Sequence, residues 1–455
     1  MEMVLEFLRD VLSQPALLIG IMSCIGLIAL KRPFHKIMTG TLKPILGYLM
    51  LAAGAGVIVS NLDPLGKMIE HGFHITGVVP NNEAIVAVAQ KVLGVETMSI
   101  LVVGLLMNLC IARFTKFKYV FLTGHHSLFM ACLMSAVLGT AGLSGMELIL
   151  VGGFLMGAWS AISPAIGQSY TSKVTDGDEI AIGHFGSLGY YLSAWVAKYV
   201  GKAEDSTEDI EIPEKWGFLR DSTLSTALTM IVFYLIAAFA AGSEFVATLS
   251  GDMSPYLYAV MSAMNFAVGV TIVYSGVRMI LGDLIPAFQG IATKIIPNAI
   301  PAVDCAVFFT YAPTAVVLGF LSSFIGGIIG MLILGAIGGV LIIPGLVPHF
   351  FCGATAGIYG NATGGRRGAA VGAFLNGLAI TFLPALALPV LGQLGFQNTT
   401  FGDADFAVMG LVLGNAYEWV GMAGIYGIVA IAALVLIIPN FIKTKSKVIN
   451  YVEED

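Results

Sequence analysis

Histidine and aspartate side chains interrupt the apolar segments of this chain at three places. His125 and His126 are adjacent in one of them. His184 ends a polar run that begins at Val174, and Asp304 has apolar neighbours on both sides. Ionisable groups in apolar segments cost free energy unless water or a polar partner reaches them, so these residues are the first candidates for a site. Imidazole both donates and accepts hydrogen bonds, which suits a sugar or sugar acid covered with hydroxyl groups.

The histidines also admit plain structural roles. His125 and His126 could bond to each other or to backbone carbonyls, and because adjacent helix positions face different ways, we expect one of the pair to be structural. His184 could lie in a surface loop. The favoured interpretation is a turn or helix cap at 175–177, after which 180–182 re-enter the membrane and deliver His184 to its interior.

Asp304 is a lone carboxylate in an apolar run, which leaves three interpretations open. It could hold a proton or a cation, accept hydrogen bonds from ligand hydroxyls, or form half of a buried ion pair with Lys294 or Lys91. Each interpretation predicts different groups around the carboxylate.

Two further segments could complete a binding site. Residues 344–351 and the glycines of 353–357 have the composition of a broken helix or hairpin tip, where freed backbone N–H groups can meet a polar ligand. Asn81, Asn82 and Glu83 form a polar group ahead of an apolar run. Packing between helices explains the glycines equally well, and a helix cap explains the polar group about as readily.

The composition places these residues in a membrane protein. Of 455 residues, 57% are hydrophobic and 11% are charged, which leaves too little polar surface for a soluble domain. Apolar runs of about 20 residues recur along the chain, whereas a transmembrane barrel alternates over segments of about 10. The predicted fold class is therefore an all-α polytopic membrane protein. No basic block is long enough to follow a nucleic-acid backbone, so nucleic acid is not expected as a partner.

The apolar runs predict about eleven transmembrane helices. They are 12–30, 41–61, 96–112, 119–141, 146–164, 223–242, 256–281, 302–321, 323–343, 368–392 and 418–440. Basic clusters follow the first, third and last of them, near Lys31, Lys116 and Lys445. Lys and Arg favour the cytoplasmic side of a membrane. All three clusters lie on that side if the number of spans is odd, with the amino terminus outside and the carboxyl terminus in the cytoplasm.

Four segments between these spans are too polar, or too broken by Gly and Pro, to cross as ordinary helices. They are 62–95, 165–222, 283–301 and 344–367. Non-helical backbone at membrane depth is typical of the re-entrant hairpins and broken helices that hold transported solutes. Within the second segment, residues 203–215 are expected to be a solvated acidic loop without a chemical role.

Two pairs of similar short segments indicate an internal repeat. Lys43–Leu49 resembles Arg278–Leu284, and Leu122–His126 resembles Leu346–Phe350, in the same order and at nearly equal separation. We therefore predict two repeats with re-entrant hairpins and amphipathic helices, and leave the handedness of the repeat open.

Other motifs exclude several functions. The five cysteines are scattered singly, which indicates buried thiols rather than a metal site or a disulfide framework. There is no G-x-x-x-x-G-K-S/T motif, so an ATP-driven pump is not indicated. We expect no metal, no cofactor and no catalytic residues. The acidic start, with Glu2 and Glu6, differs from a signal peptide, so the first helix is expected to remain in the mature protein.

Five motifs then occur in an order that is specific to one family. They are Val174–Gly177, Ile182–His184, Ala302–Ala306, Tyr311–Phe320 and Ile342–Gly345. With them the chain closely resembles the ascorbate-specific permeases, the enzyme IIC component of the bacterial phosphotransferase system. The resemblance extends from the first predicted span to about the tenth.

The resemblance implies a homodimer in the bacterial cytoplasmic (inner) membrane, with about eleven spans in each protomer. A substrate-binding core would comprise residues 71–217 and 286–415. A V-shaped dimerisation domain would comprise 1–70 and 218–285, before a last helix and cytoplasmic tail at 416–455. The core would carry L-ascorbate or a related sugar acid inward by an elevator-like motion. A separate IIB protein, phosphorylated by IIA, would then phosphorylate the sugar, so the chain itself would be a transport component and not an enzyme.

The substrate-site positions of the family carry over to two histidines, an aspartate, a hairpin tip and a contact segment before a helix. These are His125, His184, Asp304, Val347, Pro348, Asn82, Glu83 and Ala84. The chain departs from the family where Phe129 and Phe185 replace glutamines and Glu83 replaces a tyrosine. Losing amide donors and gaining aromatic faces changes how a ring hydroxyl is held, so both phenylalanines join the predicted site.

Two classes of function remain open at this level. The first is a phosphotransferase-coupled permease for L-ascorbate or a related sugar acid. The second is an ion-coupled secondary carrier for a small polar anion, in which Asp304 and His184 bind the driving ion. A membrane sensor has less support, because the polar clusters within the membrane would then lack a purpose.

Overall fold

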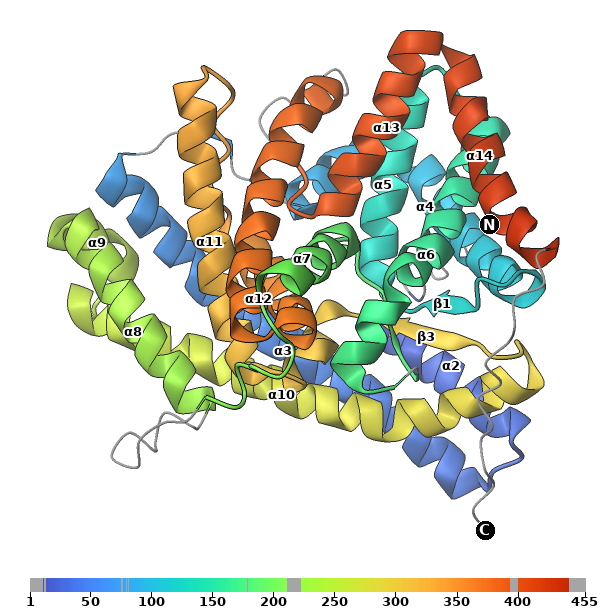
Figure 1. The fold of residues 1–455 in the computed structure, drawn as a ribbon, viewed down its shortest axis with the longest axis horizontal. Helices are drawn as coiled ribbons and strands as arrows, with labels where there is room; N and C mark the ends of the chain where they lie inside the picture. The colour runs from blue at the N-terminus through green and yellow to red at the C-terminus, as the bar shows by residue number, and fades with distance from the viewer. Residues whose placement is uncertain are drawn as a thin grey trace.

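The computed structural model describes residues 11, 14–74, 77–78, 80, 82–177, 179–210, 222–392 and 400–441. These residues form long helices and three short strands (Figure 1). In chain order the elements are α2 (Pro15–Ala29), α3 (Phe34–Phe73), α4 (Asn82–Phe114), β1 (Tyr119–Phe121), α5 (Gly124–Thr140), α6 (Gly145–Thr175), β2 (Ala181–Ile182), α7 (Ser187–Val200), α8 (Ser222–Ala241), α9 (Ser243–Ser250), α10 (Pro255–Lys294), β3 (Ile300–Val303), the 3-10 helix η2 (Cys305–Thr310), α11 (Pro313–Ala336), α12 (Leu346–Gly392), α13 (Ala404–Val420) and α14 (Met422–Phe441).

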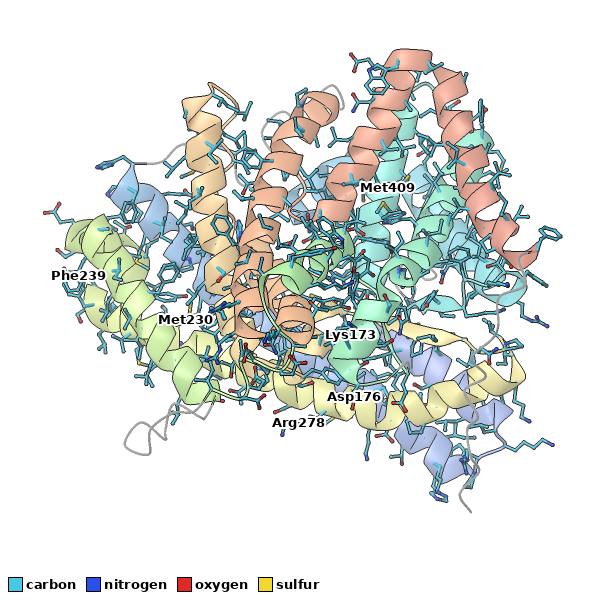
Figure 2. All side chains as sticks on the ribbon, viewed as in Figure 1. Lys173, Asp176, Met230, Phe239, Arg278 and Met409 are labelled. Atoms are coloured by element: carbon cyan, nitrogen blue, oxygen red, sulfur yellow. The ribbon has the colours of Figure 1, made fainter. Side chains whose placement is uncertain are left out.

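Seven helices of the described chain are long and apolar enough to cross a membrane, and the bent pair α8–α9 supplies an eighth if it crosses as one span. Large apolar side chains are exposed on the outer helices, among them Ile236 and Phe239 on α8 and Leu434 on α14. Figure 2 shows Phe239 at the outer edge of α8, and the charged Lys173 and Arg278 in the lower part of the view. The all-α polytopic class is thus confirmed, whereas the number of about eleven spans stays a prediction.

One pair of expected spans has a different boundary in the structure. Residues 302–321 do not form a helix throughout, because β3 and η2 occupy their first part and α11 begins only at Pro313. Oδ1 of Asp304 accepts a hydrogen bond of 3.0 Å from the N–H of Ala306 and so caps η2. Proline lacks an N–H and is favoured in the first turn of a helix. The expectation of two spans at 302–321 and 323–343 is therefore wrong, since α11 runs through both.

Helices α3 and α10 form the longest packed pair and run side by side in the lower part of Figure 1. Each has 40 residues, about 60 Å of helix. A Cβ on Gly47 would lie 2.9 Å from the carbonyl oxygen of Gly276, and one on Gly54 would lie 2.8 Å from that of Gly269. The residue number increases from Gly47 to Gly54 on α3 but decreases from Gly276 to Gly269 on α10, so the two helices are antiparallel. Glycine at these crossings lets the two backbones approach closely.

The two pairs of similar segments in the predicted repeat have comparable positions in the helices. Nζ of Lys43 lies 3.6 Å from Oδ2 of Asp283, so Lys43–Leu49 and Arg278–Leu284 meet at the same end of the α3–α10 pair. The other two segments, Leu122–His126 and Leu346–Phe350, each contain the start of a helix. The repeat itself stays a prediction.

The three strands form a parallel sheet in the order β1-β3-β2. Phe121 pairs with Ala302, and Ile182 with Val303. The ladder continues past the strands, because Gly183 N–H donates to the carbonyl of Val303 at 2.7 Å. Parallel strands end at the same edge, so the residues that follow β1, β2 and β3 are brought together. These are the histidines and the aspartate that the sequence singled out.

The described part of the acidic loop expected at 203–215 is mostly exposed, as predicted, but it also contacts two helices. Both carboxylate oxygens of Glu208 accept hydrogen bonds from the N–H of Thr314, and Oε1 also accepts from the N–H of Ala315 at 3.1 Å. Thr207 N–H donates to Oδ1 of Asn361 at 2.8 Å. An acidic side chain at a helix N-terminus satisfies free N–H groups and the helix dipole. The segment therefore ties α11 to α12, while residues 211–215 lie outside the described chain.

The glycine crossing yields a first prediction. Gly276→Ala places a methyl group where a Cβ would lie 2.6 Å from the carbonyl oxygen of Gly47, and we expect it to destabilise the detergent-solubilised protein by about 1–3 kcal/mol. The measurement is the apparent thermal midpoint. Gly56→Ala on α3 is the control, because no atom lies within 4 Å of the added Cβ. Equal midpoints for the two variants would contradict the close approach of α3 and α10.

Candidate functional site

A cavity of about 850 Å³ lies between α3 and the carboxyl ends of the strands. Its volume is in the range of sites for small molecules. The structure places most of the predicted site residues on its wall: Asn82, His125, Phe129, His184, Asp304, Val347 and Pro348. Segments far apart in the sequence thus contribute to one site.

Several helices start at this cavity. Asn82 begins α4, His125 lies in the first turn of α5, Leu346 begins α12, and Asp403 immediately precedes α13. The first N–H groups of a helix have no partner within it, and the helix dipole places partial positive charge there. Such N-termini suit a polar or anionic ligand.

His125 joins α3 to the strand ends. Its Nδ1 lies 3.4 Å from the hydroxyl of Tyr48 on α3, and its Nε2 lies 3.5 Å from Oδ2 of Asp304. A neutral ring satisfies both contacts by accepting from the tyrosine and donating to the carboxylate. Asp304 is only 7% exposed, so its position depends on this neighbour and on the N–H of Ala306.

The ion-pair interpretation of Asp304 finds no support from Lys294, which is exposed at the end of α10 while Asp304 is buried. The side chain of Lys91 lies outside the described part of the chain. The contacts that the structure gives to Asp304 come from His125 and from Ala306. Asp304 also lines the cavity, where its carboxylate can accept from a ligand hydroxyl.

His184 is 5% exposed, so the surface-loop interpretation is wrong. Its Nδ1 accepts a hydrogen bond of 3.2 Å from the N–H of Gly186 and lies 2.8 Å from the hydroxyl of Tyr190. Because a backbone N–H can only donate, Nδ1 is the acceptor and the proton of the neutral ring is on Nε2. His184 therefore offers the cavity a donor.

His126 has the same tautomer for the same reason. Its Nδ1 accepts from the N–H of Phe185 at 3.3 Å, and its ring centroid lies 3.8 Å from that of His184. We expected one of the adjacent histidines to be structural only, but His125 and His126 both line the cavity. The reason is that both lie in the first turn of α5, and this end of the helix points at the cavity.

The two phenylalanines have different places. Phe129 lines the cavity. The side chain of Phe185 is fully buried and stacks on Phe121 with the centroids 4.6 Å apart, so it belongs to the apolar core and not to the cavity wall. Its backbone N–H holds His126 instead. The side chains of Glu83 and Ala84 lie outside the described residues.

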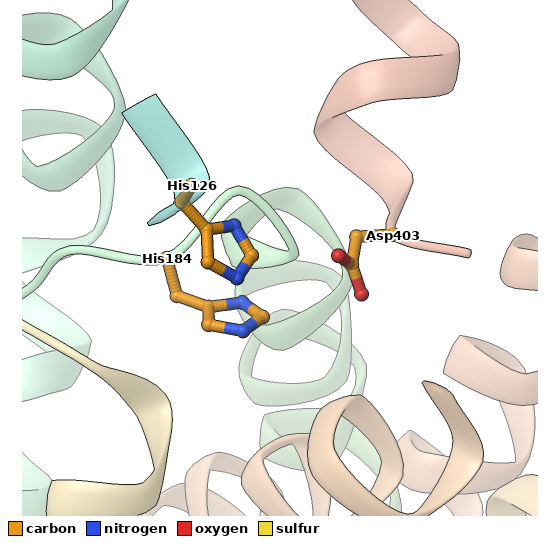
Figure 3. A group of neighbouring side chains, drawn as sticks. All are labelled: His126, His184 and Asp403. Atoms are coloured by element: carbon orange, nitrogen blue, oxygen red, sulfur yellow. The ribbon is translucent and has the colours of Figure 1, made fainter. Parts of the chain in front are cut away.

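Asp403 also lines the cavity, although the sequence did not predict it as a site residue. Its Oδ2 accepts a hydrogen bond of 2.8 Å from Nδ2 of Asn82, and its Oδ1 accepts one of 2.7 Å from Sγ of Cys352. Figure 3 shows its carboxylate facing the nitrogen-bearing edges of His126 and His184. The available signal was a pair of carboxylates, Asp403 and Asp405, in an otherwise apolar run.

Asp405 is fully buried and holds the turn that carries His184. It accepts hydrogen bonds from the hydroxyl of Ser187 at 2.7 Å, the N–H of Leu188 at 2.9 Å and Nε1 of Trp159 at 3.2 Å. Its own N–H donates to the carbonyl of Phe185 at 2.9 Å. Asp405 thereby caps α7 and fixes the chain on both sides of Gly186.

A ring nitrogen of His126, one of His184 and a carboxylate oxygen of Asp403 lie within 4.8 Å of one another, a grouping that metal ions use. The tautomers argue against a metal here. Each Nδ1 is occupied by a backbone N–H, so each neutral ring carries its proton on Nε2 and has no free lone pair for a metal. The donor set fits an uncharged polar group of a ligand better.

Comparison with known proteins gives a family match and a similar relative. The family model described as the PTS system sugar-specific permease component matches residues 10–405. The ascorbate-specific PTS system EIIC component of Mycoplasma pneumoniae is 28% identical over 417 residues, which cover 78% of this chain and 62% of that relative. The chain therefore spans somewhat less than two thirds of the length of this relative.

The contacts of Asp405 yield a second prediction. Asp405→Ala leaves the hydroxyl of Ser187 and the N–H of Leu188 buried without their acceptor, and we expect a loss of about 1–3 kcal/mol in stability. Trp159→Phe removes a single donor to the same carboxylate and should lower the thermal midpoint less. A midpoint for Asp405→Ala equal to that of the unaltered protein would show that this carboxylate does not hold the turn.

Proposed function

We propose, from the premise that this chain belongs to the family of PTS sugar-specific permease components, that it binds L-ascorbate or a related sugar acid and moves it inward across the bacterial cytoplasmic membrane. The chain is a multi-pass transport component. Ascorbate is the substrate named for the Mycoplasma relative, and the chemistry of the cavity supports a ligand of this class.

The observation that carries the proposal is the mixture of donors and acceptors around one cavity. His126 and His184 offer neutral N–H donors, Asp304 offers an acceptor, and the start of α12 at Leu346 offers backbone N–H groups. A polyhydroxylated acid presents hydroxyls that both donate and accept, together with an anionic part that suits a helix N-terminus. Apolar surface from Phe129 and Val347 completes the wall.

The face that α3 turns to the cavity supports an elevator-like motion. Its cavity residues recur every three or four positions: Tyr48, Leu51, Ala52, Ala55, Val59, Leu62, Asp63, Gly66, Lys67 and Glu70. They form a stripe along one side of the helix. The middle of the stripe is small and apolar, so the ligand-binding core (71–217 and 286–415) could slide along α3 with few polar contacts to break.

Coupling to phosphorylation completes the proposal. A separate IIB protein, itself phosphorylated by IIA, phosphorylates the sugar on the cytoplasmic side, and the permease works as a homodimer through 1–70 and 218–285. The amino terminus lies outside and the carboxyl terminus in the cytoplasm. The family membership supports the partnership, and the basic clusters near Lys31 and Lys116 support the orientation.

Transport in sealed vesicles tests the coupling. We expect uptake of radiolabelled L-ascorbate to require phosphorylated IIB and to yield a phosphorylated product inside. Vesicles that hold unphosphorylated IIB are the control. Accumulation of free, unmodified ascorbate that depends on a proton gradient and stops with a protonophore would replace the proposal with the ion-coupled carrier that uses Asp304 and His184.

Substitutions in the cavity test the site. Asp304→Asn replaces one buried acceptor oxygen with an NH2 donor, and His184→Ala removes a buried imidazole. We expect each to weaken ascorbate binding by about 1–3 kcal/mol while the protein still folds. Asp252→Asn, which removes a carboxylate from the exposed turn between α9 and α10, is the charge-matched control. Calorimetric affinities of both cavity variants equal to that of the control would remove these residues from the site.

A further inference from the structure

We propose that Asp403, with His126 and His184, forms a subsite that receives one uncharged side-chain hydroxyl group of the transported molecule, which in L-ascorbate is the C5 or the C6 hydroxyl. The inference rests on the proposed function and specifies how the site recognises its substrate. Asp403 is outside the set of residues that the sequence predicted for binding, and the sequence left open whether His125 or His126 faces the ligand. Asp403 and His126 both line the cavity.

The spacing of the group fits one oxygen atom. A ring nitrogen of each histidine and a carboxylate oxygen of Asp403 all lie within 4.8 Å of one another. For any such triangle there is a point no more than about 2.8 Å from all three corners, which is hydrogen-bond distance for N–H···O and O–H···O. Among the described residues no hydrogen bond or ion pair joins these three side chains to one another, and the three atoms are well placed around a shared oxygen.

The donors and acceptors decide what that oxygen is. His126 and His184 accept backbone N–H groups through Nδ1, so toward a ligand they donate through Nε2. Asp403 can only accept. An occupant must therefore accept hydrogen bonds and donate one as well. A hydroxyl does both, whereas a carboxylate would be repelled by Asp403 and an ammonium group would meet two N–H donors.

Burial makes the requirement selective. Asp403 is 5% exposed, and the ion pairs found among the described residues, Lys43–Asp283 and His125–Asp304, do not include it. Asn82 donates a hydrogen bond to its Oδ2 and Cys352 donates one to its Oδ1. Each oxygen therefore keeps a lone pair that can accept from a ligand. A buried carboxylate without a countercharge is costly, so a ligand hydroxyl that donates to it gains more than the same hydroxyl would gain in water.

Ligand analogues combined with variants test the subsite. The assay is equilibrium binding of radiolabelled L-ascorbate to the full-length protein, with 5-deoxy- and 6-deoxy-L-ascorbate as competitors. We expect Asp403→Ala to bind ascorbate about tenfold or more weakly. One deoxy analogue should bind the unaltered protein more weakly than ascorbate does, but should lose little further affinity in Asp403→Ala, because the hydroxyl and its acceptor act as a pair.

Two variants serve as references. Asp403→Asn keeps the size of the side chain and one acceptor oxygen, so it tests the subsite if Asp403→Ala fails to fold. Asp283→Asn removes the same charge from α10, where the carboxylate pairs with Lys43 outside the cavity, and should bind ascorbate like the unaltered protein.

The outcomes separate the inference from the function on which it rests. Unchanged ascorbate affinity in a folded Asp403→Asn or Asp403→Ala variant overturns the subsite alone, and so does an equal loss for ascorbate and for both deoxy analogues. Binding of Zn²⁺ alone to the unaltered protein, lost in Asp403→Asn, overturns it in favour of a metal site. Failure of the unaltered protein to bind any sugar acid overturns the proposed function and the subsite together.

Discussion

The pairing of β3 with β1 on one side and β2 on the other is the constraint on which the site depends. Extended backbone within a membrane protein persists only where its N–H and C=O groups find partners in the protein. Here the ladder supplies them, with Leu122 N–H donating to Ala302 at 2.9 Å and Gly183 N–H donating to Val303 at 2.7 Å. Because the strands are parallel, the chain leaves all three at one edge, and His126, His184 and Asp304 follow from there.

A second constraint comes from the helices that start beside this edge. Each start leaves N–H groups that need acceptors, and buried carboxylates meet part of that need: Asp304 for η2 and Asp405 for α7. Asp403 instead accepts from the side-chain amide of Asn82 at the start of α4. These carboxylates thus fix their surroundings, and Asp304 and Asp403 also line the cavity. Polar groups that are tied down by the fold can meet a ligand with little loss of conformational entropy.

The two faces of α3 pack in different ways. At the α3–α10 crossing, glycines such as Gly47 and Gly54 bring backbones into direct contact, which favours a rigid pair. On its other face α3 meets the cavity with small side chains such as Ala52 and Ala55. Tyr48 provides a polar contact across this boundary, through His125. A rigid helix pair beside a smooth face is what the proposed sliding motion needs.

The sequence by itself determined the membrane class, the polar clusters at His125, His184 and Asp304, and the family, because hydropathy, charged residues in apolar runs and ordered motifs are all local properties. Tertiary structure decided the rest. An apolar run such as 302–321 fits a strand or a helix equally well, and only pairing with β1 and β2 made its start a strand. The side chain of Phe185 packs in the core against Phe121. Asp403 lies beside His184 in the cavity, although more than 200 residues separate them in the sequence. Both positions depend on contacts between distant segments, which no local sequence pattern records.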